Sequence, residues 1–373
     1  MTITLLKISR LRNITDAIIP CSAHFNLLFG DNAAGKTSFL EAIYYLGNAR
    51  SFRSNQYDHV IQQNKNDLIV FAELAGDHFS IPVGLQRSRD GMLQIHIQEE
   101  RVKSIAELSR LLPIQFISSD SHRILSDGPK CRRQFMDWGL FHTNPLFFDT
   151  WKTFQQLLVQ RNAALKARAP RDELLLWNEQ FSAASEALDR LRKNYLTDFL
   201  PFFQPIVMHF MNDITLNAQY SSGWETDSTL LNQLNQNVSR ETLVGHSLYG
   251  PHRADLLFTV NTMPAHDSLS QGQQKLLSYA LRLAQGLHYR SMMNKSPIYL
   301  IDDLPSELDI EKRALITQTL LHLNAQVFIT GIERDNLNEI MALNSDSKMF
   351  HVKHGGITVV SGERSTVSVV PAL

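Results

Sequence analysis

Residues 30–37 read GDNAAGKT, a combination suited to holding the phosphates of a nucleotide. They fit the pattern G-x-x-x-x-G-K-[ST], in which Gly30 and Gly35 allow backbone N–H groups to turn toward phosphate oxygens. The Lys36 ammonium group can reach the terminal phosphates, and the Thr37 hydroxyl group can bind Mg²⁺. The stretch therefore predicts a phosphate-binding loop.

The flanking residues predict the elements that this loop needs. Apolar residues 27–29 precede it, as in a buried strand, and Phe39, Leu40 and Ile43 follow it at helical spacing. A loop between a strand and a helix N-terminus places the positive end of the helix dipole at the phosphates. The alternative, a chance glycine turn, fits this context poorly.

A second set of reactive residues follows the apolar run 298–301, where Asp302 and Asp303 stand next to each other. A buried strand that ends in carboxylates can deliver one of them to Mg²⁺. We expect Asp302 to hold the metal ion and Asp303 to polarise the attacking water. The candidate catalytic residues are therefore Lys36, Asp302 and Asp303. The alternative is a strand that ends in a solvated acidic turn.

A third stretch, LSQGQQK at 269–275, precedes a largely apolar helix expected over 276–284. The Ser270 hydroxyl group and the uncovered backbone of Gly272 lie at the start of this helix, where the helix dipole favours phosphate oxygens. On its own the stretch is equally consistent with a simple helix cap. Its position upstream of the acidic strand favours a phosphate contact.

Composition sets the broad class. The 373 residues have 36 Lys and Arg against 37 Asp and Glu, so overall charge does not favour binding to nucleic acid or to an anionic membrane. Cys21 and Cys131 lie too far apart for a cysteine-rich metal site. Residues 1–13 contain three basic side chains, and no run approaches roughly 18 uncharged apolar residues. We expect a soluble, cytoplasmic protein without a membrane partner.

The three motifs in this order resemble the ATPase head shared by ABC transporters and SMC-like DNA-repair proteins. More narrowly, the chain resembles the RecF family from end to end. Generic ABC heads lack the GPxxRR and GPHR blocks. The stretches that carry the narrower resemblance are LRN at 11–13, RSFR at 50–53, GPKCRRQFMD at 128–137, GPHRAD at 250–255, LSQGQQK at 269–275 and LIDDLPSELD at 300–309.

The resemblance implies an α/β fold with an ABC-type P-loop head, whose mixed and parallel sheet has flanking helices, and ATP and Mg²⁺ as ligands. Ala33 stands where the family usually has a glycine, so the loop tolerates positive φ less well. Ser270 and Gly272 are expected to contact the nucleotide of a second subunit, which makes ATP the link in a homodimer. The expected ATP-binding residues of the loop itself are Gly30, Asp31, Asn32, Ala33, Ala34, Gly35, Lys36 and Thr37.

Two further ligand contacts follow from the same resemblance. Arg12 is expected to reach the phosphate or base of the nucleotide, although a solvated charge beside a strand remains an alternative. Gln115 is a weaker candidate for a Mg²⁺ contact beside Thr37 and Asp302. Because many ABC heads have Glu at the position of Asp303, we expect slow turnover, as in a weak, DNA-stimulated ATPase that acts as a switch.

The middle of the chain distinguishes the SMC-like relatives from one another. Helices are expected over 150–166 and 174–200, with Pro201 and Pro205 ending the second, and no heptad run extends beyond a few turns. This excludes a long coiled coil and favours a helical lobe at 121–239, inserted between head segments 1–120 and 240–373. Residues 219–237 are polar and predict an exposed connection.

Basic residues cluster within this lobe, and they are weak candidates for contacts with DNA phosphates. A solvated helix face is an equally good explanation for each cluster. Since no cluster contains interleaved aromatic residues, contact with the DNA backbone is more plausible than base stacking. The DNA-binding candidates are Lys130, Arg132, Arg133, Arg190, Arg192 and Lys193.

The resemblance also implies a role in recombinational gap repair, replication recovery and the SOS response. It implies binding to gapped or single-stranded DNA, the partners RecR and RecO, and help with RecA loading. The main alternative is the ATPase subunit of an ABC transporter, which usually has a histidine where this chain has Thr330-Gly331-Ile332. A chromosome-tethering SMC protein is disfavoured by the missing heptads.

Overall fold

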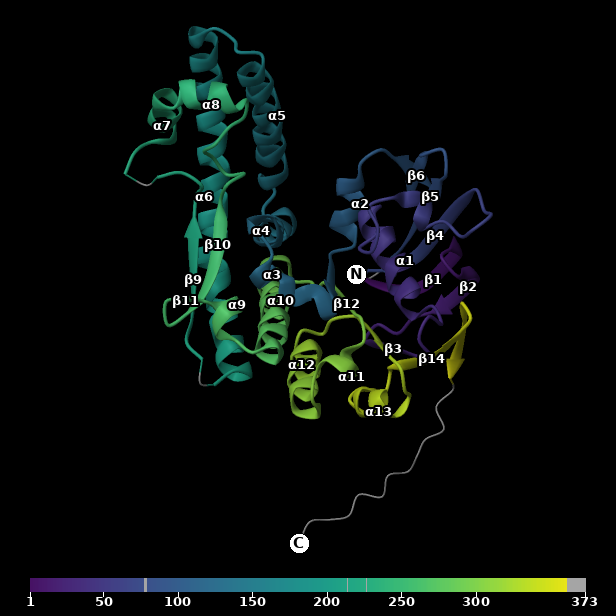
Figure 1. Cartoon of the computed structure of the whole chain (residues 1–373). Coiled ribbons are helices and arrows are strands. Elements are labelled where there is room, and N and C mark those ends of the chain that lie inside the picture. Colours follow the sequence, from purple (N-terminus) through teal and green to yellow (C-terminus); the bar gives the residue numbers. More distant parts are fainter. Residues whose placement is uncertain (77–78, 213, 226, 361–373) are drawn as a thin grey trace. The chain divides into compact units, whose positions relative to one another are not determined.

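The computed structural model describes residues 1–76, 79–212, 214–225 and 227–360 and divides the chain into two compact units (Figure 1). The first unit consists of Met1–Ser119 and Ser296–Leu373, and the second consists of Asp120–Lys295. The first boundary, between Ser119 and Asp120, is one residue from the predicted division at 120/121. The second boundary differs, because residues 240–295 include a long helix that packs within the second unit.

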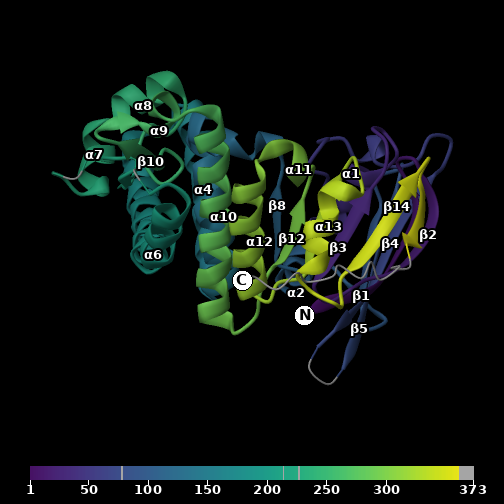
Figure 2. The ribbon, with the colours of Figure 1, turned by 90° about the horizontal axis from the view of Figure 1, so that it is seen from below.

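A mixed sheet of six strands forms the centre of the first unit (Figure 2). Five of its strands, β14, β3, β13, β12 and β8, are parallel to one another, and the edge strand β15 pairs antiparallel with β14. Their short apolar runs are buried, as is expected of parallel strands covered on both faces. The strand order is β15 (Gly356–Val360), β14 (Lys348–Lys353), β3 (Phe25–Phe29), β13 (Val327–Gly331), β12 (Ile298–Ile301) and β8 (Ile114–Ile117).

A second sheet of six strands in this unit is antiparallel throughout. In β4, buried and half-buried residues alternate, as in a sheet with one face on the core. The strand order is β2 (Ile14–Pro20), β1 (Thr2–Leu11), β4 (Asp67–Ala75), β5 (Ser80–Ser88), β6 (Leu93–Ile97) and β7 (Glu100–Val102).

Helix α1 (Lys36–Asn48) contacts both sheets and is buried along most of its length. Phe39 and Ile43 belong to a single core that also includes Leu6 of β1 and Leu300 of β12. This packing holds the phosphate-binding loop, because the helix begins at Lys36. The other helices of the unit are η1 (Tyr57–His59), α2 (Ile105–Leu111), α11 (Leu304–Glu307), α12 (Ile310–His322) and α13 (Asp335–Ala342).

The second unit is mainly helical and contains a small antiparallel sheet, with strand order β11 (Met263–Pro264), β10 (Asp255–Val260) and β9 (Leu216–Ser221). Figure 1 shows α5 (Phe147–Lys166) alongside α6 (Arg171–Phe210), and α10 (Gln271–Met293) also packs on α6. The remaining helices are η2 (Ser119–His122), α3 (Arg123–Ser126), α4 (Pro129–Thr143), α7 (Leu230–Gln236), α8 (Val238–Val244) and α9 (Ala265–Ser268).

Two expectations for the middle of the chain are wrong. Helix α6 does not end before Pro201 but continues through both prolines to Phe210. Phe199 and Phe203, on either side of Pro201, are buried, so packing compensates for the hydrogen bonds that each proline removes. The polar stretch 219–237 is not a plain connection, because it includes part of β9 and the whole of α7.

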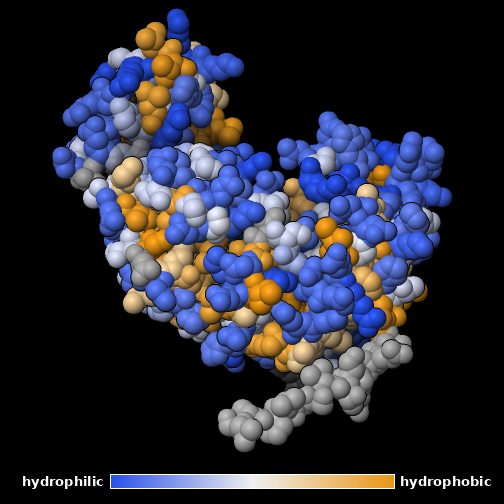
Figure 3. Space-filling view, turned by 60° about the horizontal axis from the view of Figure 1, so that its bottom comes forward, coloured by the Kyte–Doolittle hydropathy of each residue, from blue (hydrophilic) through white to orange (hydrophobic). Residues whose placement is uncertain are grey.

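The face of the molecule drawn in Figure 3 is largely hydrophilic, with apolar patches that include one at the end of the second unit where α5, α7 and α8 lie. Exposed apolar side chains of these elements and of α6 include Val159, Leu176 and Leu243. Within the described residues, no helix combines the length and the hydropathy needed to cross a membrane.

Candidate nucleotide-binding site

The phosphate-binding loop lies between β3 and α1, as the sequence predicts. Gly30 has φ 150° and Gly35 has φ 120°, and a Cβ atom on Gly30 would lie 2.2 Å from the carbonyl oxygen of Val352. Only glycine fits at that position. Ala33 adopts φ 62°, so the alanine takes the left-handed conformation that the family's usual glycine would take without strain.

The Lys36 ammonium group is held inside this loop. Its Nζ atom donates to the carbonyl oxygens of Gly30, at 2.6 Å, and Asp31, at 2.9 Å. Burial lowers the pKa of Lys36 below its ordinary value, although the carboxylates of Asp303 and Asp302 act in the opposite direction. The loop therefore presents a partly desolvated cation that phosphate oxygens can bind.

Asp302 connects the phosphate-binding loop to the strand that ends beside it. Thr37 Oγ1 donates to the Asp302 carboxylate, at 3.0 Å from Oδ2, and Thr330 Oγ1 donates to Oδ1 at 2.7 Å. Carboxylate and hydroxyl oxygens are the ligands that Mg²⁺ prefers. Thr37 and Asp302 can therefore hold Mg²⁺ as predicted, and Thr330 is an additional residue that orients the carboxylate.

Asp303 has an uncommon backbone conformation, with φ 57°. Its N–H group donates to Thr330 Oγ1 at 2.8 Å, and its Oδ1 atom accepts from Ser306 Oγ at 2.9 Å. Aspartate tolerates left-handed φ better than most residues do. This backbone conformation directs the carboxylate, together with Asp302, to the wall of the same cavity.

One cavity of about 720 Å³ in the first unit is lined by Lys36, Thr37, Asp302, Asp303 and Thr330. Its volume falls within the usual range for ligand pockets and suits a nucleotide. It is lined by residues 32–38 of the loop and by Arg12, Asn13, Arg53, Ser119, Asp302, Asp303, Thr330 and Ile332.

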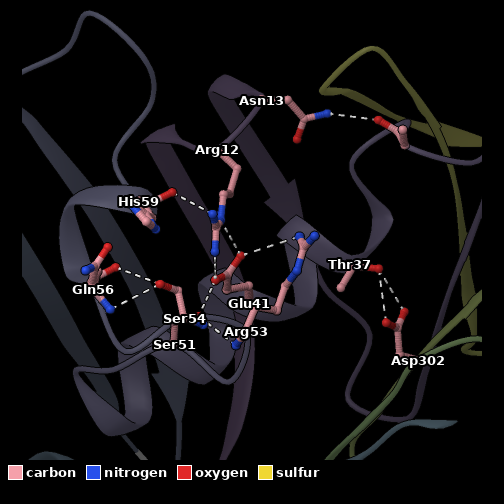
Figure 4. A network of polar contacts seen from close by, with 11 residues as sticks. Arg12, Asn13, Thr37, Glu41, Ser51, Arg53, Ser54, Gln56, His59 and Asp302 are labelled. Atoms are coloured by element: carbon pink, nitrogen blue, oxygen red, sulfur yellow. Dashed lines mark hydrogen bonds and ion pairs between the residues drawn. The ribbon is translucent and has the colours of Figure 1, made fainter. Parts of the chain in front are cut away.

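Arg12 and Asn13 form the two-residue turn between β1 and β2. Asn13 Nδ2 donates to the carbonyl oxygen of Ala34 at 3.0 Å, so the turn supports the phosphate-binding loop. Figure 4 shows the Arg12 guanidinium group against the carboxylate of Glu41. Arg12 lines the cavity, and its contact with the phosphate or base of the nucleotide stays a prediction. Glu41, which the sequence analysis did not single out, holds the Arg12 guanidinium group in place.

Comparison with known proteins identifies the family of the chain. The model of the RecF/RecN/SMC N terminal domain matches residues 2–358. The DNA replication and repair protein RecF of Coxiella burnetii (strain Dugway 5J108-111) is 42% identical over 355 residues, which cover 95% of this chain and 98% of the relative. The chain belongs to the RecF family. The RecF protein of Shewanella oneidensis is 39% identical over 360 residues, which cover 96% of this chain and all of the relative.

Solved structures show the same fold as this RecF-family chain. The recombination mediator protein RecF-ATP in the RecFOR pathway matches with a TM-score of 0.84 and 22% identity, covering 96% of this chain and 98% of the other. An Smc head bound to the C-winged helix domain of ScpA matches with a TM-score of 0.60 and 13% identity, covering 98% of both chains. These matches confirm the predicted ABC-type α/β head with a second, mainly helical unit.

One predicted metal contact, Gln115, lies away from the cavity. Gln115 is fully buried on β8 and pairs with Tyr299 of β12. Three residues of extended strand, roughly 10 Å, separate the level of Tyr299 from that of Asp302. Gln115 does not line the cavity, whereas Ser119, beyond the end of β8, does. The structure therefore does not place Gln115 beside Thr37 and Asp302.

The signature residues Ser270 and Gly272 of this RecF-family chain lie in the second unit, at the start of α10. The Ser270 side chain accepts from the N–H group of Gln273 at 3.3 Å, and the Gln273 side chain accepts from the N–H group of Ser270 at 2.9 Å. This capping box confirms that the stretch caps a helix. Ser270 and Gly272 are also exposed, and a Cβ atom on Gly272 would meet no described atom within 4 Å.

The basic residues of the second unit divide into two groups. Arg132 is buried and makes a bidentate pair with Asp255, at 2.7 and 3.0 Å. Arg192 is likewise buried against Asp137, at 3.0 Å for both bonds. The structure gives these two arginines a structural role, because each would have to break its pair with a half-buried carboxylate to reach a DNA phosphate.

The other four basic candidates have more freedom. Lys130 and Arg190 are exposed. Lys193 is also exposed, although its Nζ atom pairs with Asp189 at 2.7 Å. Arg133 is half-buried and donates to the carbonyl oxygen of Ala254 at 2.7 Å. Side-chain types and spacing did not distinguish these residues from Arg132 and Arg192, since only the fold determines which carboxylate each arginine meets.

Proposed function

We propose that this chain is an ATP-dependent DNA-binding protein of recombinational gap repair and replication recovery. In this proposal ATP joins two copies of the chain head to head on DNA. The observation that carries it is the cavity in which Lys36, Thr37, Asp302 and Asp303 converge, in a chain 42% identical to a DNA replication and repair protein. None of the relatives named above is a transporter subunit.

The residues of the cavity fit ATP. Gly30 leaves room for the loop to pack closely on Val352, and Lys36 supplies a cation for the phosphates. Thr37 and Asp302 would hold Mg²⁺, which when bound neutralises phosphate charge. A solved relative of the same fold is described as RecF-ATP, which favours ATP as the nucleotide.

Asp303 would orient and polarise the water that attacks the terminal phosphate. Its side chain is one methylene group shorter than the glutamate of many ABC heads, and Ser306 already donates to one of its oxygens. Both features reduce its access to the water, so hydrolysis is slow and acts as a release step. DNA is expected to stimulate this weak ATPase activity.

The exposed start of α10 supports the proposed dimerisation. Ser270 and Gly272 offer a hydroxyl group and an open backbone at the N-terminus of a 23-residue helix, where a phosphate group is favoured. In a two-fold dimer, these residues of one copy would complete the nucleotide site of the other. ATP would then stabilise the dimer, because it binds both copies at once.

Sedimentation velocity tests this link between ATP and dimerisation. With ATP and Mg²⁺ present, the wild-type chain is expected to sediment as a dimer, and without ATP as a monomer. Ser270→Arg places a large side chain at the shared phosphate and should leave a monomer in both conditions. A dimer of Ser270→Arg that still requires ATP would contradict the proposed role of this residue.

The DNA-binding surface is expected to include the exposed basic residues of the second unit. The balanced total charge of the chain limits binding to local patches, which a dimer would present twice. The family resemblance and the RecFOR pathway of the solved relative support gapped DNA, RecR and RecO as partners, with RecA loading and SOS induction downstream.

Neutralising Lys130 and Arg190 together is expected to weaken DNA binding about threefold to tenfold at moderate salt. The salt dependence of the binding constant should become shallower by about one for each phosphate contact that is lost. The measurement is fluorescence anisotropy of a labelled duplex over a series of salt concentrations. Lys65→Gln with Lys103→Gln, two exposed lysines of the first unit, is the matched control. An unchanged slope would remove these residues from the DNA-binding surface.

A further inference from the structure

Glu41 is a fully buried carboxylate one helical turn after the phosphate-binding loop. It lies four residues after Thr37 on α1, so both side chains project from the same face of the helix. Thr37 contacts Asp302 inside the cavity, whereas Glu41 contacts residues at the edge of the cavity. A buried charge is retained only when it is paired and hydrogen-bonded.

Arg12 is the strongest partner of Glu41. Its Nε and Nη2 atoms donate to the two carboxylate oxygens, at 2.9 and 2.7 Å, in a bidentate pair. Its Nη1 atom donates to the carbonyl oxygen of His59 at 2.6 Å. Arg12 has φ 52°, an uncommon conformation for a residue with a long side chain. The guanidinium plane is therefore fixed on both sides at the wall of the cavity.

Arg53 is held more loosely by the same carboxylate. Its Nη1 atom lies 3.9 Å from Glu41 Oε2, and its side chain is 48% exposed. Ser51 links the two residues, because its hydroxyl group donates to Glu41 Oε1 and accepts from the N–H group of Arg53 at 2.8 Å. Figure 4 shows Arg12, Ser51 and Arg53 converging on Glu41.

We infer that Glu41 is a positioning residue that holds Arg12 rigidly and Arg53 loosely at the nucleotide cavity. The inference rests on the proposed function, since both arginines line the cavity in which ATP would bind. Glu41 would not touch the nucleotide itself. Its charge would fix the Arg12 guanidinium group, and its contact with Ser51 would place Arg53 within reach of the nucleotide.

A pair of the same kind outside the cavity provides a control. Arg10 and Asp67 also form a bidentate pair, at 2.8 and 3.1 Å, in the same antiparallel sheet. Neither residue lines the cavity. Asp67→Asn therefore removes a carboxylate, 21% exposed where Glu41 is fully buried, from an arginine two residues away in the sequence without altering the cavity wall.

The experiment compares Glu41→Gln with Asp67→Asn by titration with a fluorescent ATP analogue. Misplacing a contacting group by about 1 Å can cost a hundredfold in reaction rate, and a smaller loss, about tenfold in affinity, is expected for Glu41→Gln. Asp67→Asn should remain within about twofold of wild type. Thermal melting of both variants shows whether folding is affected equally.

Two further variants separate positioning from a general structural role. In an Arg12→Gln background, Glu41→Gln should cost about twofold or less, because the group through which it acts is gone. Ser51→Ala keeps the Glu41 charge and should weaken nucleotide binding by about threefold through Arg53. Ser51→Ala still gives a result if Glu41→Gln does not fold.

Three outcomes overturn the inference. The first is an equal loss of affinity for the analogue in Glu41→Gln and Asp67→Asn, and the second is the full loss from Glu41→Gln in the Arg12→Gln background. The third applies if Glu41→Gln does not fold, and it is a Ser51→Ala variant that binds the analogue as tightly as wild type does. In each of these cases the wild-type chain still binds the analogue and the proposed function stands. If the wild-type chain does not bind the analogue at all, the proposed function itself fails. The two failures are therefore distinguishable.

Discussion

Lys36→Met is expected to lower the affinity for ATP by about a hundredfold, which corresponds to about 2.7 kcal/mol at 25 °C. The methionine has a similar length but cannot donate hydrogen bonds or charge to phosphate. Lys36 bridges the carbonyl oxygens of Gly30 and Asp31, so its loss leaves the backbone of the loop in place but removes its cation. Calorimetric titration with ATP measures the change.

Asp303→Asn is the control for this variant. It removes the carboxylate expected to polarise water but keeps the side-chain shape and the tolerance for φ 57°. ATP affinity should therefore remain within a few-fold of wild type while steady-state hydrolysis falls by about two orders of magnitude. Equal ATP affinity in Lys36→Met and wild type would contradict the assignment of the loop.

The pH dependence of ATP binding also tests the role of the Lys36 cation. Only the ammonium form of Lys36 attracts phosphate, and burial lowers its pKa below the ordinary value of 10.5. The affinity for ATP is therefore highest below the lowered pKa of Lys36 and falls as the pH rises through that pKa. The loss should begin at a lower pH than it would for an exposed lysine, and it should be absent from Lys36→Met.

Arg161→Ala is expected to lower the free energy of unfolding of the second unit by about 3–5 kcal/mol. Arg161 and Glu241 are both fully buried and paired with each other. Arg161 Nε also donates to Asn178 at 2.8 Å, and Nη1 donates to Ser247 at 2.6 Å. Alanine would leave the Glu241 carboxylate buried without its guanidinium partner, accepting from the N–H group of Leu248 at 2.7 Å.

Urea denaturation followed by tryptophan fluorescence measures this effect in the second unit. The four tryptophans of the chain, Trp138, Trp151, Trp177 and Trp224, all lie between residues 120 and 295. Arg161→Met with Glu241→Leu removes both charges and should recover most of the lost stability, because no buried charge remains unpaired. A midpoint for Arg161→Ala equal to that of wild type would show that the pair contributes nothing.

Local pattern was enough to predict the elements that form the candidate nucleotide site. The loop at 30–37 and the acidic strand end at 302–303 each need only a few adjacent residues, so their spacing determines their geometry. Their convergence follows because β3, β13 and β12 are parallel neighbours and their carboxyl ends meet at one edge of the sheet. Thr330 joins them from the end of β13 for the same reason.

Features that depend on distant packing were not predictable in this way. The residue types of Arg132 and Arg192 show that both are basic, but only the fold brings Asp255 and Asp137 against them. Glu41 is similar, since a glutamate in an amphipathic helix is usually solvated and its burial depends on the turn at Arg12. The continuation of α6 through Pro201 likewise depends on the packing of neighbouring aromatic side chains.

The most direct test of the proposed function is fluorescence anisotropy of a labelled gapped duplex titrated with the chain, with and without ATP and Mg²⁺. If two copies bind DNA together, ATP should tighten binding about tenfold or more through the second contact surface. Lys36→Met and Ser270→Arg should each lose this gain, the first through ATP binding and the second through the dimer. Binding that is equally tight with and without ATP, or a Ser270→Arg variant that keeps the gain, would contradict an ATP-dependent clamp.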